Sequence, residues 1–134
     1  MYKVTKQIFF CYGHRLLDYA GPCRHPHGHN ARVDIEIMGE NLDKSHVLYP
    51  FENLKEIVQD WIDRELDHKM LLRRDDPLVE PLKTLDEPVC LFETNPTAEA
   101  IAKLIYKYAQ SKGLPVTEIR VWETESSFAA YRET

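Results

Sequence analysis

The segment Cys23–His29 reads Cys-Arg-His-Pro-His-Gly-His and puts three imidazoles and a thiol into one short stretch. It leads into residues 31–38, where apolar and mostly polar side chains alternate as in a half-buried antiparallel strand. Side chains two positions apart leave the same face of a strand, so His27 and His29 lie side by side if the strand includes them. Gly28 between them permits close approach of backbone or metal.

His14 is available as a third imidazole upstream of this pair. Three neutral imidazoles, each about 2.0–2.1 Å from Zn²⁺, form the ligand set of many catalytic zinc sites and leave a fourth position open. The alternative is a histidine-rich turn whose rings are only solvated or hydrogen-bonded. The upstream histidine, together with Cys23 four residues before His27, favours the metal site on His14, His27 and His29.

Composition narrows the classes of protein that remain. The 134 residues are expected to form one domain over 1–134, and 43% hydrophobic with 29% charged residues is typical of soluble globular proteins. A net charge of −5 without a basic run argues against a nucleic-acid partner. No apolar run approaches the ~20 residues of a membrane span, and the first residues begin no signal peptide.

The cysteines also bear on location. Cys11, Cys23 and Cys90 are odd in number and lack Cys-x-x-Cys spacing, so neither a disulfide framework nor a structural zinc knuckle is indicated. Free thiols in a reducing cytoplasm are expected.

The hydrophobic pattern predicts an α+β fold. Gly113 and Pro115 should end the second of two helices, and Thr97 should cap its start. The expected elements are strands at 2–10 and 31–38, helices at 51–66 and from 97 onward, and strands at 116–123 and 128–132. This order gives a four-stranded antiparallel sheet with two helices on one face. Its two unprotected edges point to edge-to-edge assembly of subunits into a closed β-barrel.

Four further features could take part in chemistry. Asp67 beside His68 could fix the imidazole tautomer and raise its basicity, although a helix-terminal histidine also suits the helix dipole. Cys23 near a metal would supply a thiolate, whereas its alternative is a small buried hydrophobe. Glu123 is either an exposed carboxylate at a strand end or an anchor for a ligand bearing N–H donors. Glu99 most simply complements the dipole of the second helix.

Taken together, the motifs resemble the pterin synthases, which comprise 6-pyruvoyl-tetrahydropterin synthase and the 6-carboxy-tetrahydropterin synthase of the queuosine pathway. The resemblance covers nearly the whole chain. Its motifs, in family order, are Phe10-Cys11-Tyr12-Gly13-His14-Arg15-Leu16, Cys23-x₃-His27-Gly28-His29-Asn30, Leu66-Asp67-His68, Asn95-Pro96-Thr97-Ala98-Glu99, and Glu123-Thr124 with Ala130-Tyr131.

The resemblance implies the tunnelling fold (T-fold), in which subunits join sheets into barrels and two trimers commonly stack as a hexamer. It implies active sites at subunit interfaces and Zn²⁺ on His14, His27 and His29. By position, Cys23 matches the catalytic thiol, and Asp67 with His68 matches a second proton-transfer pair. Glu123 matches the carboxylate that binds the pyrimidine edge of the pterin, with Thr97 as a secondary contact.

Three departures from the family pattern concern other positions. The stretch Ser45–Phe51 replaces the usual Gly-Met-Val-x-Asp-Phe, and Leu72 and Ala100 each stand where asparagine is usual. The Cys-x₃-His-Gly-His spacing resembles the bacterial carboxy branch, since a longer insertion is typical of the pyruvoyl branch.

The implied reaction is zinc-dependent conversion of a pterin triphosphate, 7,8-dihydroneopterin triphosphate, to 6-carboxy-5,6,7,8-tetrahydropterin with release of triphosphate and acetaldehyde. The expected enzyme is a cytoplasmic lyase and a homo-oligomer, a trimer or hexamer. Three alternatives stay open: the pyruvoyl product, a non-catalytic zinc- or pterin-binding oligomer, and a zinc hydrolase that uses metal-bound hydroxide.

Overall fold

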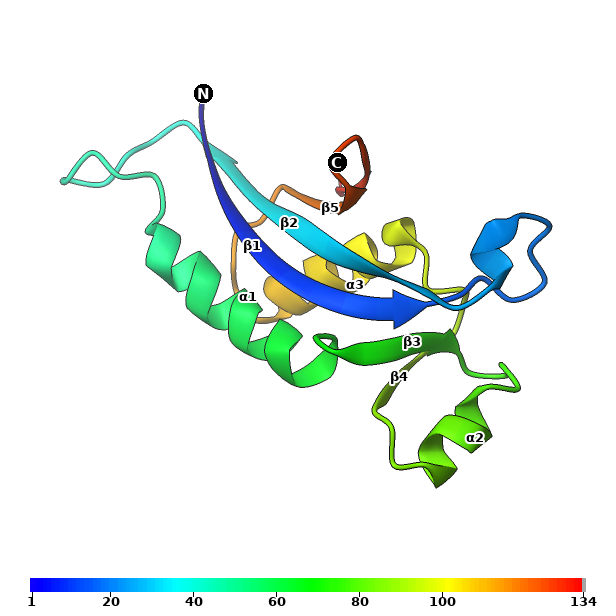
Figure 1. Ribbon diagram of the computed structural model, residues 1–134. Helices are drawn as coiled ribbons and strands as arrows, with labels where there is room; N and C mark the ends of the chain where they lie inside the picture. The colour runs from blue at the N-terminus through cyan, green and yellow to red at the C-terminus, as the bar shows by residue number, and fades with distance from the viewer. Residues whose placement is uncertain (134) are drawn as a thin grey trace.

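The computed structural model describes residues 1–133, which form six strands, three α-helices and one 3₁₀ helix in an α+β arrangement (Figure 1). The strands join one sheet in the order β4-β3-β1-β2-β5-β6. In chain order the elements are β1 (Tyr2–His14), η1 (Pro22–Arg24), β2 (His27–Gly39), α1 (Phe51–Glu65), β3 (Lys69–Arg73), α2 (Val79–Thr84), β4 (Val89–Phe92), α3 (Ala98–Ser111), β5 (Glu118–Thr124) and β6 (Ser127–Tyr131).

The long antiparallel pair β1 and β2 forms the backbone of the sheet. Both predicted strands are confirmed and both are longer than expected, because pairing continues to the position where His14 faces His27. Gly13 pairs with Gly28 just before that point, and a Cβ on Gly28 would lie 3.2 Å from the Tyr12 carbonyl oxygen. The glycine pair therefore allows the strands to stay close where they carry the histidines.

The prediction of a four-stranded, purely antiparallel sheet is wrong in its extent. The four expected strands are present, but β3 and β4 extend the sheet beyond β1, and both of these pairings are parallel. They have five and four residues, too few to separate a strand period from a buried loop. The six-residue helix α2 between them was missed for the same reason.

The helices α1 and α3 lie on one side of the sheet, as predicted (Figure 1). α3 packs on β5 and β6, α1 packs on β1, and the two helices also contact each other. Thr97 caps α3, accepting a hydrogen bond from the Ala100 N–H, and Gly113 has φ +80°, so both predicted helix signals are confirmed. Pro50 stands at the N-cap of α1, one position before the first helical turn. None of the helices within residues 1–133 is both long and apolar enough to cross a membrane.

An ion pair with a buried carboxylate links the connection between β1 and β2 to the turn that follows β3. Arg15 makes a two-point contact with Asp76, donating from Nε to Oδ2 at 2.8 Å and from its terminal nitrogen to Oδ1. Asp76 is 3% exposed and also accepts a hydrogen bond from the Leu78 N–H. The Arg15 guanidinium holds the pKa of Asp76 below its usual range.

Asp76→Asn is expected to lower the free energy of unfolding by about 2–3 kcal/mol, because the new amide would turn a donor toward the donors of Arg15. A carboxyl group with a depressed folded-state pKa stabilises above its unfolded pKa of about 3.9. The difference between wild type and variant should therefore shrink as pH falls below about 4.

Urea unfolding at pH 7 and at acidic pH measures this difference. Asp75→Asn is the matched control, since Asp75 is exposed beside Arg73 and its loss should change stability much less. Equal stabilities of the Asp76 and Asp75 variants would contradict the buried pair's role.

Candidate active site

Three imidazoles meet where the β1–β2 pair ends. His14 is the last residue of β1, and His27 and His29 are the first and third residues of β2. The ring centroids are 4.5 Å apart for His14 and His27 and 5.1 Å apart for each of the other two pairs. Each ring offers a nitrogen, and these three atoms lie within 4.8 Å of one another. The structure thus brings the predicted metal set together.

Backbone carbonyls fix the tautomers of two of these rings. Nδ1 of His14 lies 2.7 Å from the Pro96 carbonyl oxygen, and Nδ1 of His27 lies 2.7 Å from that of His25. A carbonyl only accepts, so each Nδ1 carries the proton and each Nε2 keeps its lone pair. Such outer hydrogen bonds accompany most metal-binding histidines.

The ring nitrogens that face the centre need a partner. Nε2 of His14 and Nε2 of His29 are buried, and within residues 1–133 neither has a partner in hydrogen-bond geometry, although both lie near the carboxylate of Glu123. Burial lowers the pKa of His29, which favours the neutral ring that a metal requires. A divalent cation would satisfy these nitrogens, and a set of three imidazoles without a thiolate suits Zn²⁺. The residues present therefore fit the expected metal.

Glu123, at the end of β5, lies next to the histidines. Its Oε2 is 2.8 Å from His29 Nε2 and 3.3 Å from His14 Nε2. The Tyr12 hydroxyl donates to the same oxygen at 3.4 Å. The neighbouring His14 imidazole, assisted by His29, holds the pKa of Glu123 below its usual range despite burial. Glu123 is therefore a half-buried anion at the histidine cluster and not a free carboxylate at a strand end.

A surface hollow of about 380 Å³ begins at Glu123. It is also lined by Glu99 of α3 and by residues 127–130 of β6. The predicted role of Glu99 is limited to the dipole of its own helix, because nothing in the local sequence pattern shows that α3 starts beside β6. The hollow thus has two carboxylates on its wall.

Asp67 and His68 form a second cluster, in the turn between α1 and β3. Asp67 Oδ1 accepts the Cys11 N–H at 3.0 Å, and Oδ2 lies 2.7 Å from His68 Nδ1. Burial raises the pKa of Asp67, but the hydrogen bonds from Cys11 and His68 outweigh it, so the pKa is lowered. His68 adopts φ +59°, and its N–H donates to the Cys11 carbonyl. The predicted carboxylate–imidazole pair is thus formed and held on β1.

This pair opens onto another hollow, of about 480 Å³, which His68 and His29 both line. The side chain of His68 is 79% exposed, which leaves its Nε2 free to approach a ligand. Cys11, Asp67 and His68 also have ligand atoms within 4.8 Å of one another, yet both carboxylate oxygens are already engaged by Cys11 and His68.

The last two predicted residues lie on separate elements. Cys23 is partly buried on η1, in the connection from β1 to β2, and its carbonyl accepts the Leu16 N–H at 2.9 Å. Thr97 uses its hydroxyl to accept the Ala100 N–H at 3.1 Å. The cap predicted for Thr97 is confirmed, while contact of Thr97 or Cys23 with a ligand stays a prediction.

The chain is similar to known proteins over nearly its whole length. The family model described as "6-pyruvoyl tetrahydropterin synthase" matches residues 3–134. The chain is 30% identical to the 6-carboxy-5,6,7,8-tetrahydropterin synthase of Rickettsia conorii, over 96% of this chain and 98% of the relative. It is also 30% identical to the protein of that name from Haemophilus influenzae, over 99% of this chain and all of the relative.

Solved structures share the fold. A crystal structure of an uncharacterized protein from Wolinella succinogenes has a TM-score of 0.82 at 24% identity, over 99% of this chain and 98% of that one. The 6-pyruvoyl tetrahydropterin synthase of Caenorhabditis elegans has a TM-score of 0.73 at 23% identity, over 99% and 96%. The predicted T-fold architecture of the subunit is therefore confirmed, and the chain belongs to the 6-pyruvoyl tetrahydropterin synthase family.

Proposed function

We propose that the chain is a zinc-dependent pterin synthase that converts 7,8-dihydroneopterin triphosphate and water to 6-carboxy-5,6,7,8-tetrahydropterin, with release of triphosphate and acetaldehyde. The observation that carries the proposal is the convergence of the ring nitrogens of three imidazoles, within 4.8 Å of one another, beside the carboxylate of Glu123. The names of the curated relatives support this product over others.

His14, His27 and His29 would hold Zn²⁺, which supplies Lewis-acid chemistry to substrate oxygens when bound. The thiolate of Cys23 would take a proton from the substrate side chain. His68, oriented by Asp67 at 2.7 Å, would exchange a second proton. Glu123 would accept the paired N–H groups of the pterin, with Thr97 as a secondary contact.

The proposal also covers the domain organisation, oligomeric state and location of the protein. Residues 1–134 would act as one domain in a cytoplasmic homo-oligomer, a trimer or hexamer, and serve queuosine biosynthesis. The sheet in residues 1–133 ends in the strands β4 and β6, and pairing of such edges between subunits would close a barrel.

The decisive experiment is incubation of zinc-loaded protein with 7,8-dihydroneopterin triphosphate and identification of the products by mass. The proposal requires 6-carboxy-5,6,7,8-tetrahydropterin together with acetaldehyde. A 6-pyruvoyl product without acetaldehyde would assign the chain to the other branch, and unchanged substrate would leave a non-catalytic binding protein.

Glu123→Gln should weaken pterin binding by roughly tenfold or more. A carboxylate accepts both N–H groups at the pyrimidine edge of a pterin, whereas the amide presents a donor to one of them. The resulting unsatisfied pair costs about 1–3 kcal/mol, and 1.4 kcal/mol corresponds to a factor of ten. Calorimetric titration with biopterin or sepiapterin measures the change.

Glu125→Gln is the control, because Glu125 is exposed in the turn after β5 and should leave affinity unchanged. Metal content should stay the same in both variants. Equal pterin affinity of wild type and Glu123→Gln would remove Glu123 from the pterin site.

A further inference from the structure

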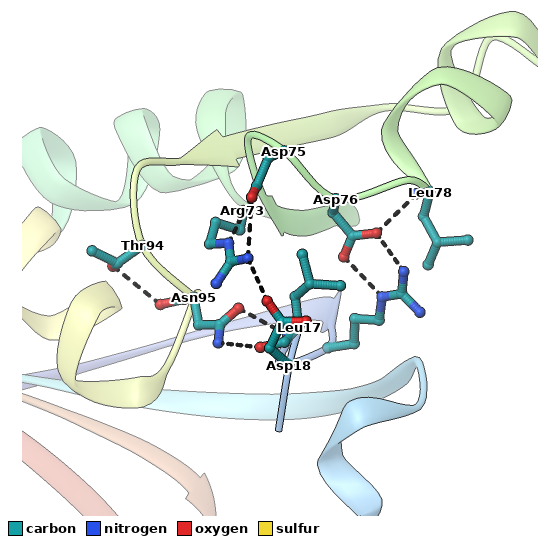
Figure 2. Close-up of polar contacts among 9 residues, drawn as sticks. Leu17, Asp18, Arg73, Asp75, Asp76, Leu78, Thr94 and Asn95 are labelled. Atoms are coloured by element: carbon teal, nitrogen blue, oxygen red, sulfur yellow. Dashed lines mark hydrogen bonds and ion pairs between the residues drawn. The ribbon is translucent and has the colours of Figure 1, made fainter. Parts of the chain in front are cut away.

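The four residues after His14, a proposed metal ligand, each make a specific contact. Figure 2 shows the contacts of Leu17 and Asp18. Arg15 pairs with Asp76, and the Leu16 N–H donates to the Cys23 carbonyl. Leu17 binds the side chain of Asn95, and Asp18 accepts a hydrogen bond from Arg73 at 2.9 Å. Residues 15–18 are therefore a fixed start for the connection that carries Cys23.

The contact with Asn95 differs from the others because it is two-way. Asn95 Oδ1 accepts the Leu17 N–H at 2.9 Å, and Asn95 Nδ2 donates to the Leu17 carbonyl at 2.9 Å. One partly buried amide side chain thus satisfies both backbone groups of Leu17, as a neighbouring strand would. Only an amide of this length offers a donor and an acceptor together in that position.

This contact is one residue away from the proposed catalytic thiol's own anchor. The Leu16 N–H donates to the Cys23 carbonyl at 2.9 Å. The Leu17 N–H lies in the peptide group next to the one whose N–H holds the Cys23 carbonyl, so fixing Leu17 restrains that neighbouring peptide group. Pro96, the residue after Asn95, accepts a hydrogen bond from His14 Nδ1 at its carbonyl oxygen, at 2.7 Å. The neighbours Asn95 and Pro96 therefore position the segment of the thiol and a proposed metal ligand.

The contact of Asn95 with Leu17 and the contact of Pro96 with His14 are both held in place by the start of α3. The Thr97 N–H donates to the Asn95 carbonyl at 2.9 Å, and the Thr97 side chain caps the helix. Asn95 and Pro96 are thereby held by a long helix that packs on the sheet. A displacement of the Asn95 side chain would move the Cys23 segment relative to the histidines without removing any ligand.

We propose that Asn95 is a positioning residue, which holds Cys23 in register with the metal centre through Leu17 and Leu16. The inference rests on the proposed function only for the role of Cys23. It assigns to Asn95 an effect on the chemical step and none on metal binding.

Two variants test it. Asn95→Ala removes both hydrogen bonds, and Asn95→Asp keeps the acceptor for the Leu17 N–H but turns a carboxylate toward the Leu17 carbonyl. Both should lower kcat about 10–100-fold, because misplacement of a reacting group by about 1 Å has effects of that size. KM should stay within about twofold, since Asn95 is not placed in the binding hollow.

A second readout needs no turnover. In the metal-loaded protein, the rate of Cys23 alkylation by iodoacetamide, followed by peptide mass, should rise about threefold or more in both variants as the segment opens locally. Cys11 and Cys90 serve as internal references, and their rates should not change. A rise at all three thiols would mean general loosening of the fold and would overturn the proposal.

Asp18→Asn is the matched control, because it removes the charge from the Arg73 contact of the same segment, and asparagine tolerates the positive φ of Asp18. It should match wild type in kcat and alkylation. Wild-type kcat and Cys23 reactivity in folded Asn95→Asp would overturn the positioning role. Full turnover in a Cys23 variant would instead refute the proposed function, while the alkylation rates would still decide the role of Asn95.

Discussion

Replacement of Cys23 by alanine is expected to lower turnover by about 10²–10⁴-fold while bound metal and oligomeric state stay unchanged. A positioned acid or base contributes a factor of this size to the rate of proton transfer. The histidine cluster does not depend on the thiol, because its three ring nitrogens already lie within 4.8 Å of one another without Cys23. Steady-state assay with 7,8-dihydroneopterin triphosphate, beside elemental analysis, measures both quantities.

Cys90→Ala is the control for loss of a thiol as such. Cys90 lies on β4, and burial raises its pKa, so it offers little thiolate and should be replaceable without loss of rate. Loss of metal from Cys23→Ala would make Cys23 a ligand and the site closer to a structural one. Full activity of that variant would favour a hydrolase that uses metal-bound hydroxide.

The parts of the fold that sequence predicted are those specified by local chemistry. Thr97 caps the start of α3 and Gly113 takes a left-handed conformation at its end. Each acts within one turn of its own helix, so the local sequence is enough to predict both. The alternation in residues 31–38 also reports burial on one face directly. The strands β3 and β4 have no such signal, since β3 pairs with β1 and β4 pairs with β3, and both pairings join segments that are distant in the sequence.

The candidate site divides in the same way. The histidine cluster was found because residue type and i, i+2 spacing carry the signal, and Asp67 beside His68 was found by adjacency. The imidazoles of His14 and His27 are oriented by the backbone carbonyls of Pro96 and His25. Every residue has a backbone carbonyl, so residue type could not predict these contacts. Tyr12 and Glu99 were missed because their contacts with Glu123 or its hollow join elements far apart in the chain.

Alanine in place of His29 is expected to remove nearly all tightly bound zinc. Loss of a partner outside the ligand set already weakens metal binding by about 10–100-fold, and loss of a ligand should exceed about 100-fold. His29 is the proposed ligand whose Nε2 is buried without a partner in hydrogen-bond geometry in the described chain and whose pKa is lowered by burial. Its ring is thus prepared for metal, and elemental analysis after dialysis should find about one metal per chain in wild type and almost none in the variant.

His25→Ala provides a control from the same segment. His25 is exposed, and the group that orients His27 is the backbone carbonyl of residue 25, which alanine retains. This variant should keep the full metal content, as should Glu123→Gln, because Glu123 is assigned to the pterin and not to the metal. Full metal in His29→Ala would refute the three-histidine site. Loss of metal only when His29→Ala is combined with Glu123→Gln would show that the carboxylate, 2.8 Å from His29 Nε2, replaces the missing imidazole as a ligand.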